Sequence, residues 1–437
     1  MTQLLNFTKN YYFLFLFLYF FTLPIAHTAA IQSISISLFI VCFFAFEFKS
    51  IAFKALLSQK TTLFLFGGLL VLALISLFFT PDLHDSLKEI RNELVRNFLL
   101  TFCLFYVVIT KNDAMLKRIL LILFCVFLFH TISNIVLWIS YGGFPVRSGG
   151  FLDGGPGFAG ERFGVWATYT LAFSIGLFYT PYKKIAWALF ALSLLSIFAN
   201  NTRATYVACL LILFAFIFLF NKSKLLKVMT IGLFCVILLV FHEYSDKFSN
   251  RYNLKNTLAQ AELFYELPPA RYGEIESKGL DHSITSRLAM WKSVIAYRLE
   301  EPFIPAGYGR FLYTKIIKRH FDTSHPENIP YANYPQAHNE FFSMLCALGV
   351  FGLILFVVLL GFTIQQAYKL FNTTSHHQNL QKIFSIIVFF GTFGFIGSLL
   401  FGSFFGDTEA KLFYCLLGIL LGINYKKTHE NHISKTV

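Results

Sequence analysis

His338 is the residue of this 437-residue chain that is best suited to move a proton. It stands with Asn339 in a polar stretch, 335–342, that leads directly into a long apolar run. An imidazole can act as a general base near neutral pH, and the positive end of a following helix favours its uncharged form. The pattern predicts a catalytic base at the mouth of a membrane helix, with Asn339 in support.

Four arginines also lie near the ends of apolar runs, and a bound anion would explain them. Arg147 and Arg162 belong to the glycine-rich segment 141–164, Arg203 to the short connection 200–205, and Arg287 to the start of an amphipathic stretch. A guanidinium stays charged and binds phosphate oxygens in pairs. Beside a base, such a cationic cleft suits displacement of a diphosphate leaving group by a hydroxyl. Each arginine could instead be a snorkelling or surface charge.

Two acidic residues, Asp407 and Glu409, lie on the last predicted outer turn. Either one could orient the histidine or bind a sugar hydroxyl, and Asp407 could simply cap a helix. The outer carboxylates and histidines show no metal-ligand spacing. The sequence therefore predicts no metal and no cofactor.

Composition indicates the fold class. Hydrophobic residues make up 56% of the chain, charged residues only 14%, and the mean hydropathy is +0.62. These values are typical of an all-α polytopic membrane protein and exclude a soluble globule. All seven cysteines lie inside apolar runs, so neither a disulfide framework nor a thiolate metal site is indicated.

Apolar runs long enough to approach the thickness of a bilayer predict about twelve transmembrane helices. They lie near 11–26, 31–46, 61–79, 98–110, 118–140, 163–180, 185–200, 205–220, 226–241, 341–367, 383–404 and 410–424. The first could be a signal peptide, but we interpret it as an uncleaved span. The predicted organisation is helices 1–9 in 1–241, a large outer loop in 242–335, helices 10–12 in 336–425 and a tail in 426–437.

The distribution of charge predicts the orientation. The net charge is +13, and the excess lysine and arginine fall on the side of both termini, which the positive-inside rule assigns to the cytoplasm. His338 and the four arginines then lie on the opposite, outer side. The basic balance is a membrane-orientation signal, so no nucleic-acid partner is predicted.

Local patterns predict how these residues are positioned. Residues 81–97 read as an amphipathic segment at the membrane interface, or equally as a solvated connector. Residues 286–297 read as a helix capped by Ser286, ending before Pro302, with an apolar face of Leu288, Trp291 and Ile295 that can include Val294. Gly349 and Gly352 are expected to let their helix pack closely against a neighbour.

These motifs together resemble the O-antigen ligase/polymerase superfamily. Residues 337–342 with 348–353 are similar to its histidine–asparagine and glycine signature, Thr202-Arg203-Ala204 to its arginine turn, and 286–291 with 307–309 to its loop element. Residues 158–164 correspond in place to its glycine/arginine loop. Gln336 and Leu348 depart from residues that many members carry there.

The resemblance implies a glycosyltransferase of the bacterial inner membrane that works at the periplasmic face. The donor would be a glycan on undecaprenyl diphosphate and the acceptor, for a ligase, a hydroxyl of lipid A core within the membrane lipids. His338 would be the base, with Arg203, Arg287, Arg162 and Arg147 binding the diphosphate, and Asn339 and Asp407 in support. A polymerase with the same donor is the alternative, and a flippase for lipid-linked oligosaccharides is the alternative without chemistry.

Overall fold

A computed structural model describes residues 12–47, 53–111, 113–144, 146–152, 160–220, 282–324, 336–374, 379–402 and 408–436. Within these ranges every regular element is a helix and none is a strand, which confirms the predicted all-α polytopic membrane protein. Six helices are long and apolar enough to cross a membrane: Lys60–Phe78, Leu83–Thr110, Asp113–Ser140, Lys183–Asn200, Glu340–Thr373 and Leu380–Leu399. Three shorter apolar helices cover Phe13–Thr22, Ala29–Ala45 and Arg203–Leu219.

Helices occupy each predicted span except 226–241, which lies outside the described residues. The full number of spans and their membrane sides stay predictions. The final helix, α19, runs from Thr408 to Thr436, so no helix end marks the predicted start of the tail at residue 426.

The chain forms two compact units, described here one at a time. The first contains Met1–Gly67, Asn92–Ile212 and Val357–Val437, and the second contains Gly68–Arg91 and Leu213–Phe356. The first holds α2 (Phe13–Thr22), α3 (Ala29–Glu47), α4 (Phe53–Ser58), α7 (Arg96–Thr110), α8 (Asp113–Ser140), η3 (Gly150–Leu152), α9 (Gly160–Leu177), α10 (Lys183–Asn200), α18 (Asn379–Leu399) and α19. The second holds η1 (Ser76–Phe78), α6 (Leu83–Glu89), η4 (Phe216–Phe220), α15 (His282–Glu300), η7 (Arg310–Leu312) and α16 (Tyr313–Ser324). Four helices are divided between the two units: α5 (Lys60–Ile75), η2 (Ile90–Val95), α11 (Arg203–Ala215) and α17 (Glu340–Thr373).

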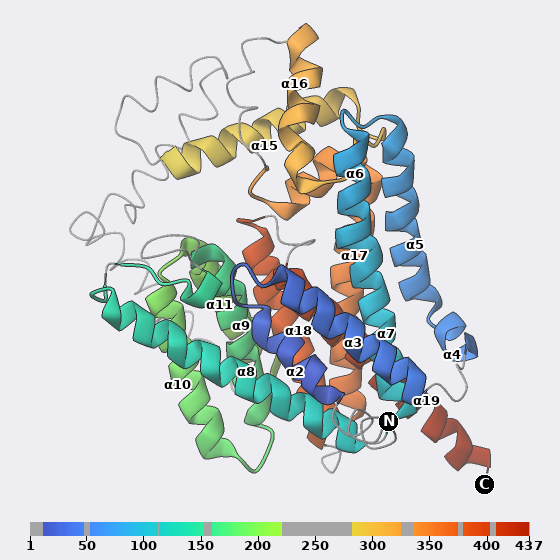
Figure 1. Cartoon of the computed structure of the whole chain (residues 1–437), viewed down its shortest axis with the longest axis vertical. Coiled ribbons are helices and arrows are strands. Elements are labelled where there is room, and N and C mark those ends of the chain that lie inside the picture. The colour runs from blue at the N-terminus through green and yellow to red at the C-terminus, as the bar shows by residue number, and fades with distance from the viewer. Residues whose placement is uncertain are drawn as a thin grey trace. The chain divides into compact units, whose positions relative to one another are not determined.

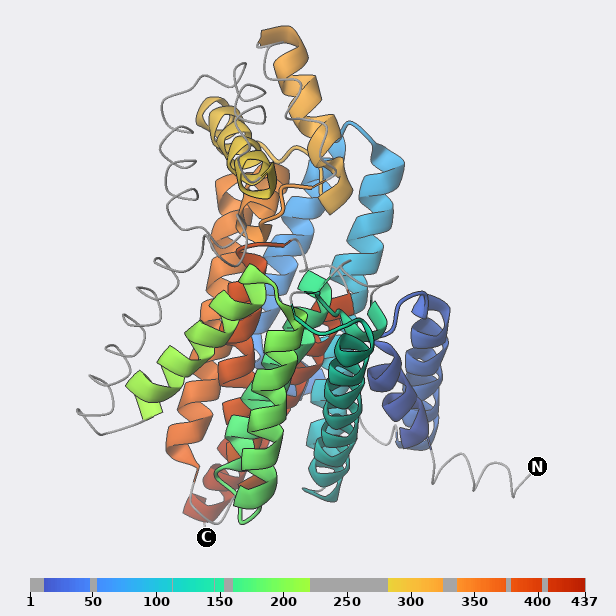
Figure 2. The same ribbon diagram turned by 90° about the vertical axis from the view of Figure 1, so that its left-hand side faces the viewer.

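The first unit is a bundle of helices packed side by side (Figures 1 and 2). α9 lies against α8, α10 and α18, and α19 lies along α7. Small residues bring some of these backbones very close: a Cβ added at Gly418 of α19 would lie 2.2 Å from the carbonyl oxygen of Thr101 in α7. Close packing at glycine is how helices associate where lipid removes the hydrophobic drive between them.

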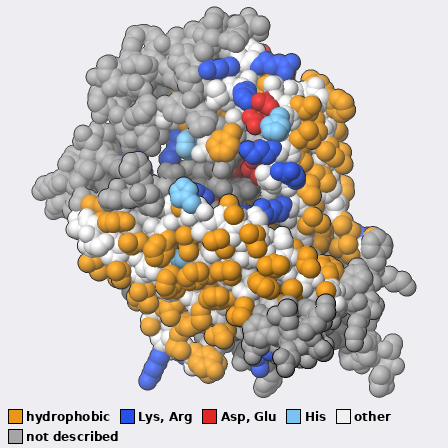
Figure 3. Space-filling model, in the orientation of Figure 1, with side chains coloured by type: hydrophobic (Ala, Val, Ile, Leu, Met, Phe, Trp, Pro, Cys, Tyr) orange, Lys and Arg blue, Asp and Glu red, His pale blue; other side chains and the backbone are white. Residues whose placement is uncertain are grey.

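The outer surface of this bundle is apolar. Figure 3 shows hydrophobic side chains covering the drawn face over α2, α3 and α8. Among them, Ile34, Val41, Leu121 and Ile139 are each about 60% exposed. An apolar face this broad marks a surface that contacts lipid.

The second unit has its own small core, formed where α15 and α16 pack on the first turns of α17 (Figure 1). The buried members of this core are Met290, Val294, Tyr297, Ala306, Leu312, Tyr313, Ile316, Ile317, Ala337 and Cys346. Ala337 directly precedes the predicted base, so the chain around His338 is anchored in this core.

The interpretation of 81–97 as a separate segment is wrong. α6, a π-helical stretch at Ile90–Val95 and α7 form one continuous helical run, Leu83–Thr110. Buried Ser86, Ile90 and Leu94 recur every four residues along it, which is the spacing of one packed helix face. The mixed charges of this stretch concealed the helix from a reading based on hydropathy.

The boundaries of α15 also differ from the prediction at one end. The helix begins at His282, so Ser286 lies inside it and is not the N-cap, whereas its end at Glu300, before Pro302, is confirmed. The apolar face is rotated as well. Val294 is buried, in agreement with the prediction, but its buried neighbours are Met290 and Tyr297, while Ile295 is 44% exposed, because α15 turns its face toward α16 and α17.

Candidate active site

His338 occupies a strained backbone position immediately before α17. Its φ is +50°, a left-handed conformation that costs a non-glycine residue free energy and is often found at functional positions. Asn339 is buried and caps the helix, because its Oδ1 accepts hydrogen bonds from the backbone N–H of Phe341 (2.9 Å) and Phe342 (3.2 Å). The role found for Asn339 is therefore to begin α17 and fix the direction of the chain at His338.

Trp291 of α15 holds the same segment from the side. Its indole N–H donates to the carbonyl oxygen of Ala337 at 2.9 Å, and its ring stacks on Phe342 with centroids 5.3 Å apart. Trp291 thus contacts the chain on both sides of His338. Arg287 precedes Trp291 by one helical turn and so lies on the same face of α15. Within the second unit, the structure brings the predicted base and one predicted arginine into one neighbourhood.

α17 is not a continuous helix, because Gly349 interrupts it with φ +69° and ψ −167°. The break takes backbone carbonyl and N–H groups out of the helical hydrogen-bond ladder, and the loop after α15 satisfies one of each. Ala306 N–H donates to the carbonyl oxygen of Ala347 at 2.8 Å, and Val350 N–H donates to that of Pro302 at 2.9 Å. A Cβ at Gly349 would lie 2.8 Å from the Pro302 oxygen, which confirms that Gly349 permits close packing.

Gly352 has a different role from the one predicted. A Cβ added there would lie 2.2 Å from Cβ of Leu348, a residue of the same helix on the other side of the break. Gly352 therefore makes room for the break itself and does not pack against a neighbouring helix.

Arg298, at the end of α15, is a positioning residue that the sequence analysis missed. It is 4% exposed and donates to the carbonyl oxygens of Glu301 (2.7 Å), Ile304 (2.6 Å) and Cys346. Its guanidinium also lies 4.3 Å from the centre of the Tyr297 ring. One buried cation therefore ties α15 to the last turn of α17 before the break. Its place in the last turn of an amphipathic helix suggested only an ordinary interaction with the helix dipole.

Three of the predicted arginines belong to the first unit, and their three segments meet there around Asn200. Asn200 donates to the carbonyl oxygen of Ser148 (3.1 Å), next to Arg147, and accepts from Thr202 and Thr205 (both 2.7 Å), which flank Arg203. Gly164, two residues after Arg162, packs so closely that a Cβ there would lie 1.9 Å from the Thr205 hydroxyl. The backbones that carry Arg147, Arg162 and Arg203 are thus locked together.

Arg203 itself is the first residue of α11. It follows Asn201, whose φ of +50° reverses the chain between α10 and α11. The side chain of Arg203 is half-buried, and it lies at the N-terminal end of α11, the positive end of the helix dipole. Both features favour an anion.

Arg147 is half-buried, and its Nη2 atom is buried without a hydrogen-bond partner among the residues that the structure describes. A buried guanidinium nitrogen is costly to leave unpaired. Its surroundings therefore suit a ligand oxygen.

Arg162 has a protein partner. Its Nε donates to the Glu409 carboxylate at 2.8 Å, and Glu409 is fully buried while Arg162 is about one-third exposed. Glu409 thus pairs with Arg162, which gives this carboxylate a role that the sequence analysis did not assign. Asp407, the other acidic candidate, lies outside the described residues.

The comparisons with known proteins agree with this assembly of motifs. No curated protein sequence matches the chain. Residues 188–357 match the family model described as O-antigen ligase, a range that includes Arg203, Arg287, Trp291 and His338. The match suggests an activity of the O-antigen ligase or polymerase type, on a lipid-linked glycan and in a membrane. This match over residues 188–357, together with the motifs above, supports membership of the O-antigen ligase superfamily.

Proposed function

We propose that this protein is an O-antigen ligase, a glycosyltransferase that moves a glycan from undecaprenyl diphosphate to a hydroxyl of lipid A core. The observation that carries the proposal is the fixed position of His338. Asn339 caps the helix after it, Trp291 binds the chain on both sides of it, and Arg287 lies one turn before Trp291 on α15. A fixed base with a cationic side chain nearby supports the proposed roles of His338 and Arg287.

In the proposed reaction His338 accepts the proton of the acceptor hydroxyl. The acceptor oxygen then forms a bond to the anomeric carbon of the donor glycan, and the bond from that carbon to the diphosphate oxygen breaks. The diphosphate leaves with the bonding electrons and carries additional negative charge. His338 ends the step as an imidazolium that must release its proton to solvent.

The arginines stabilise the departing charge. Arg203 and Arg287 bind the diphosphate oxygens, and Arg147, with its unpaired buried nitrogen, adds a further donor. Arg162 contributes less charge to the ligand, because it shares its guanidinium with Glu409. Donors aimed at developing charge in a partly dehydrated site are among the largest contributions to catalysis.

The proposal places the protein in the bacterial inner membrane with its active site at the periplasmic face and both termini in the cytoplasm. Its partners are the lipid-linked donor, the lipid A-core acceptor and membrane lipids. The reaction as written needs no metal and no cofactor.

A His338→Ala strain tests the proposal. Loss of a ligase leaves bare lipid A core while long glycans accumulate on the lipid carrier, and loss of a polymerase leaves core with a single repeat. Loss of a transporter would instead leave the lipid-linked glycan on the cytoplasmic side of the membrane. His84→Ala, an exposed histidine of α6, is the matched control and should leave lipopolysaccharide normal.

A purified assay in metal-free buffer tests the role of the base. Removal of a general base should lower the transfer rate by at least about 100-fold, with donor binding retained. Turnover of His338→Ala at the wild-type rate would refute the assignment.

A further inference from the structure

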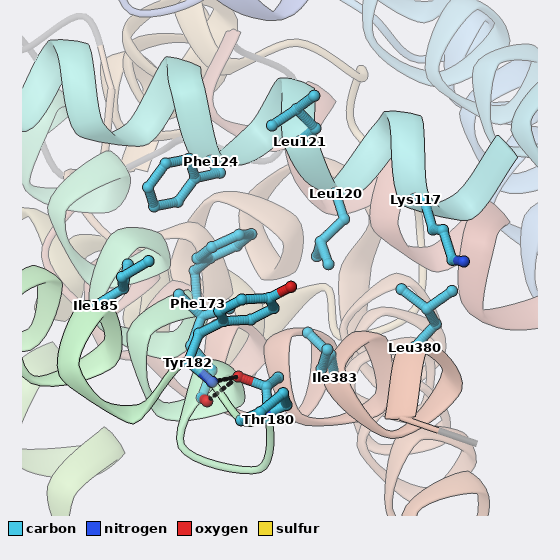
Figure 4. Close-up of a pocket in the computed structure, with 12 residues that line it drawn as sticks. Lys117, Leu120, Leu121, Phe124, Phe173, Thr180, Tyr182, Ile185, Leu380 and Ile383 are labelled. Carbon is cyan, nitrogen blue, oxygen red and sulfur yellow. Dashed lines mark hydrogen bonds between the residues drawn. The ribbon is translucent and has the colours of Figure 1, made fainter. Parts of the chain in front are cut away.

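A cavity of the first unit lies away from the arginine segments. It has a volume of about 610 Å³ and is lined by the beginning of α8, the end of α9, the beginning of α10 and the beginning of α18 (Figure 4). Arg147 follows the opposite end of α8, and Asn200 is the last residue of α10. This cavity therefore belongs to the predicted cytoplasmic side, and no step of the proposed reaction uses it.

The walls of the cavity suit a hydrocarbon chain. Leu120, Phe124, Phe173 and Ile383 point into it (Figure 4). Leu121 and Tyr182 on its rim are 61% and 63% exposed, so the cavity opens to the surroundings of the helices. A groove of this size lies within the roughly 300–1,000 Å³ range of ligand pockets, and its open side faces what the sequence and fold identify as lipid.

One end of the groove carries positive charge. Lys117 of α8 lines it next to Leu380 (Figure 4), and the exposed Lys183 and Lys184 stand between the lining residues Tyr182 and Ile185. Asp113, one turn before Lys117, is the acidic residue nearest to it along α8, and no ion pair or hydrogen bond of Lys117 occurs among the described residues. An ammonium so placed can bind a phosphate.

We propose that this groove holds an anionic phospholipid, with one acyl chain against Leu120, Phe124 and Phe173 and its phosphate bound by Lys117. A zwitterionic lipid offers the same chain but no net negative charge to the lysines. The charge of the rim, together with the apolar walls, therefore selects the headgroup. The site is independent of the glycosyltransferase activity proposed above.

Native mass spectrometry of the full chain in detergent micelles tests the site. Phosphatidylglycerol and phosphatidylcholine with identical acyl chains are titrated against the wild type, Lys117→Glu and Lys60→Glu. Lys60, exposed at the start of α5 and absent from the groove lining, is the matched control. Wild type and Lys60→Glu should bind phosphatidylglycerol more tightly than phosphatidylcholine. Lys117→Glu should weaken the binding of phosphatidylglycerol by about tenfold.

A second variant separates the chain from the headgroup. Leu121→Trp places a bulky ring on the exposed rim of the groove without disturbing the core, and it should weaken binding of both lipids. Equal binding of the two lipids by wild type, or an unchanged headgroup preference in Lys117→Glu, would overturn the phosphate site. Unchanged phosphatidylglycerol binding in Leu121→Trp would overturn the placement of the chain. If Lys117→Glu fails to fold, Lys117→Gln replaces it and should lose the preference to a smaller degree.

Discussion

Arg203 shows how much depends on the shape of a single side chain. It begins α11 directly after a left-handed turn, and Thr202 and Thr205 on either side of it are bound to Asn200. A backbone locked this firmly presents the guanidinium at a fixed angle. We therefore expect the geometry of the side chain at this position to matter as well as its charge.

Arg203→Lys tests this expectation. An ammonium keeps the charge but cannot bind two phosphate oxygens in a planar fork, so we expect donor affinity to fall by about tenfold or more, since charge-assisted hydrogen bonds are worth roughly 1.5–3 kcal/mol. The measurement is the dissociation constant for the lipid-linked donor in detergent. Arg118→Lys, an exposed arginine of α8, is the control. Near-normal donor binding by Arg203→Lys would exclude the diphosphate role.

At the scale of one element, the break in α17 is the feature that sets the direction of the His338 segment. Gly349→Ala should destabilise the fold, because alanine disfavours φ +69° and its Cβ would lie 2.8 Å from the Pro302 oxygen. We expect a loss of about 1–3 kcal/mol or more from the backbone strain, measured by thermal unfolding in detergent. Gly361→Ala, in the same helix with nothing within 4 Å of the added Cβ, should instead be neutral or stabilising. Equal effects of the two substitutions would contradict this account of the break.

The contact between α6 and α16 predicts a dependence on pH. The Asp85 backbone N–H and the Lys315 ammonium lower the pKa of Asp82 to about 2, and Lys315 contacts Asp82 at 2.5 Å and Asp85 at 3.0 Å. Because the folded-state pKa lies below the usual value, this stabilisation is complete above about pH 4 and is lost as the pH falls toward 2. The thermal unfolding temperatures of wild type and Asp82→Asn, measured between pH 5 and pH 2.5, should therefore converge as the pH falls. A difference that does not change with pH would contradict the predicted titration.

Hydropathy predicted the helices well because a bilayer leaves the backbone no other way to satisfy its hydrogen bonds. It could not predict that 83–110 is one helix, since Glu93 and Arg91 interrupt the apolar pattern, nor that Gly349 breaks α17, since apolar residues continue on both sides of it. The roles proposed for His338 and the arginines come from residue type and position, and they stay predictions. Arg298 and Glu409 were not, because their roles depend on tertiary partners, Cys346 and Arg162, that lie far away in the chain.

At the scale of the whole molecule, the distribution of charge predicts which side each segment faces. The rims that carry Lys117, Lys183 and Lys184 should be cytoplasmic, and α15, α16 and His338 should be periplasmic. A fluorescent protein that matures only in the cytoplasm, fused after Val437, should therefore fluoresce. Alkaline phosphatase, which folds only outside, should be active when inserted at residue 330 and inactive when inserted after Lys183. An active phosphatase after Lys183 together with a dark fusion after Val437 would reverse the orientation and contradict the proposed periplasmic position of His338.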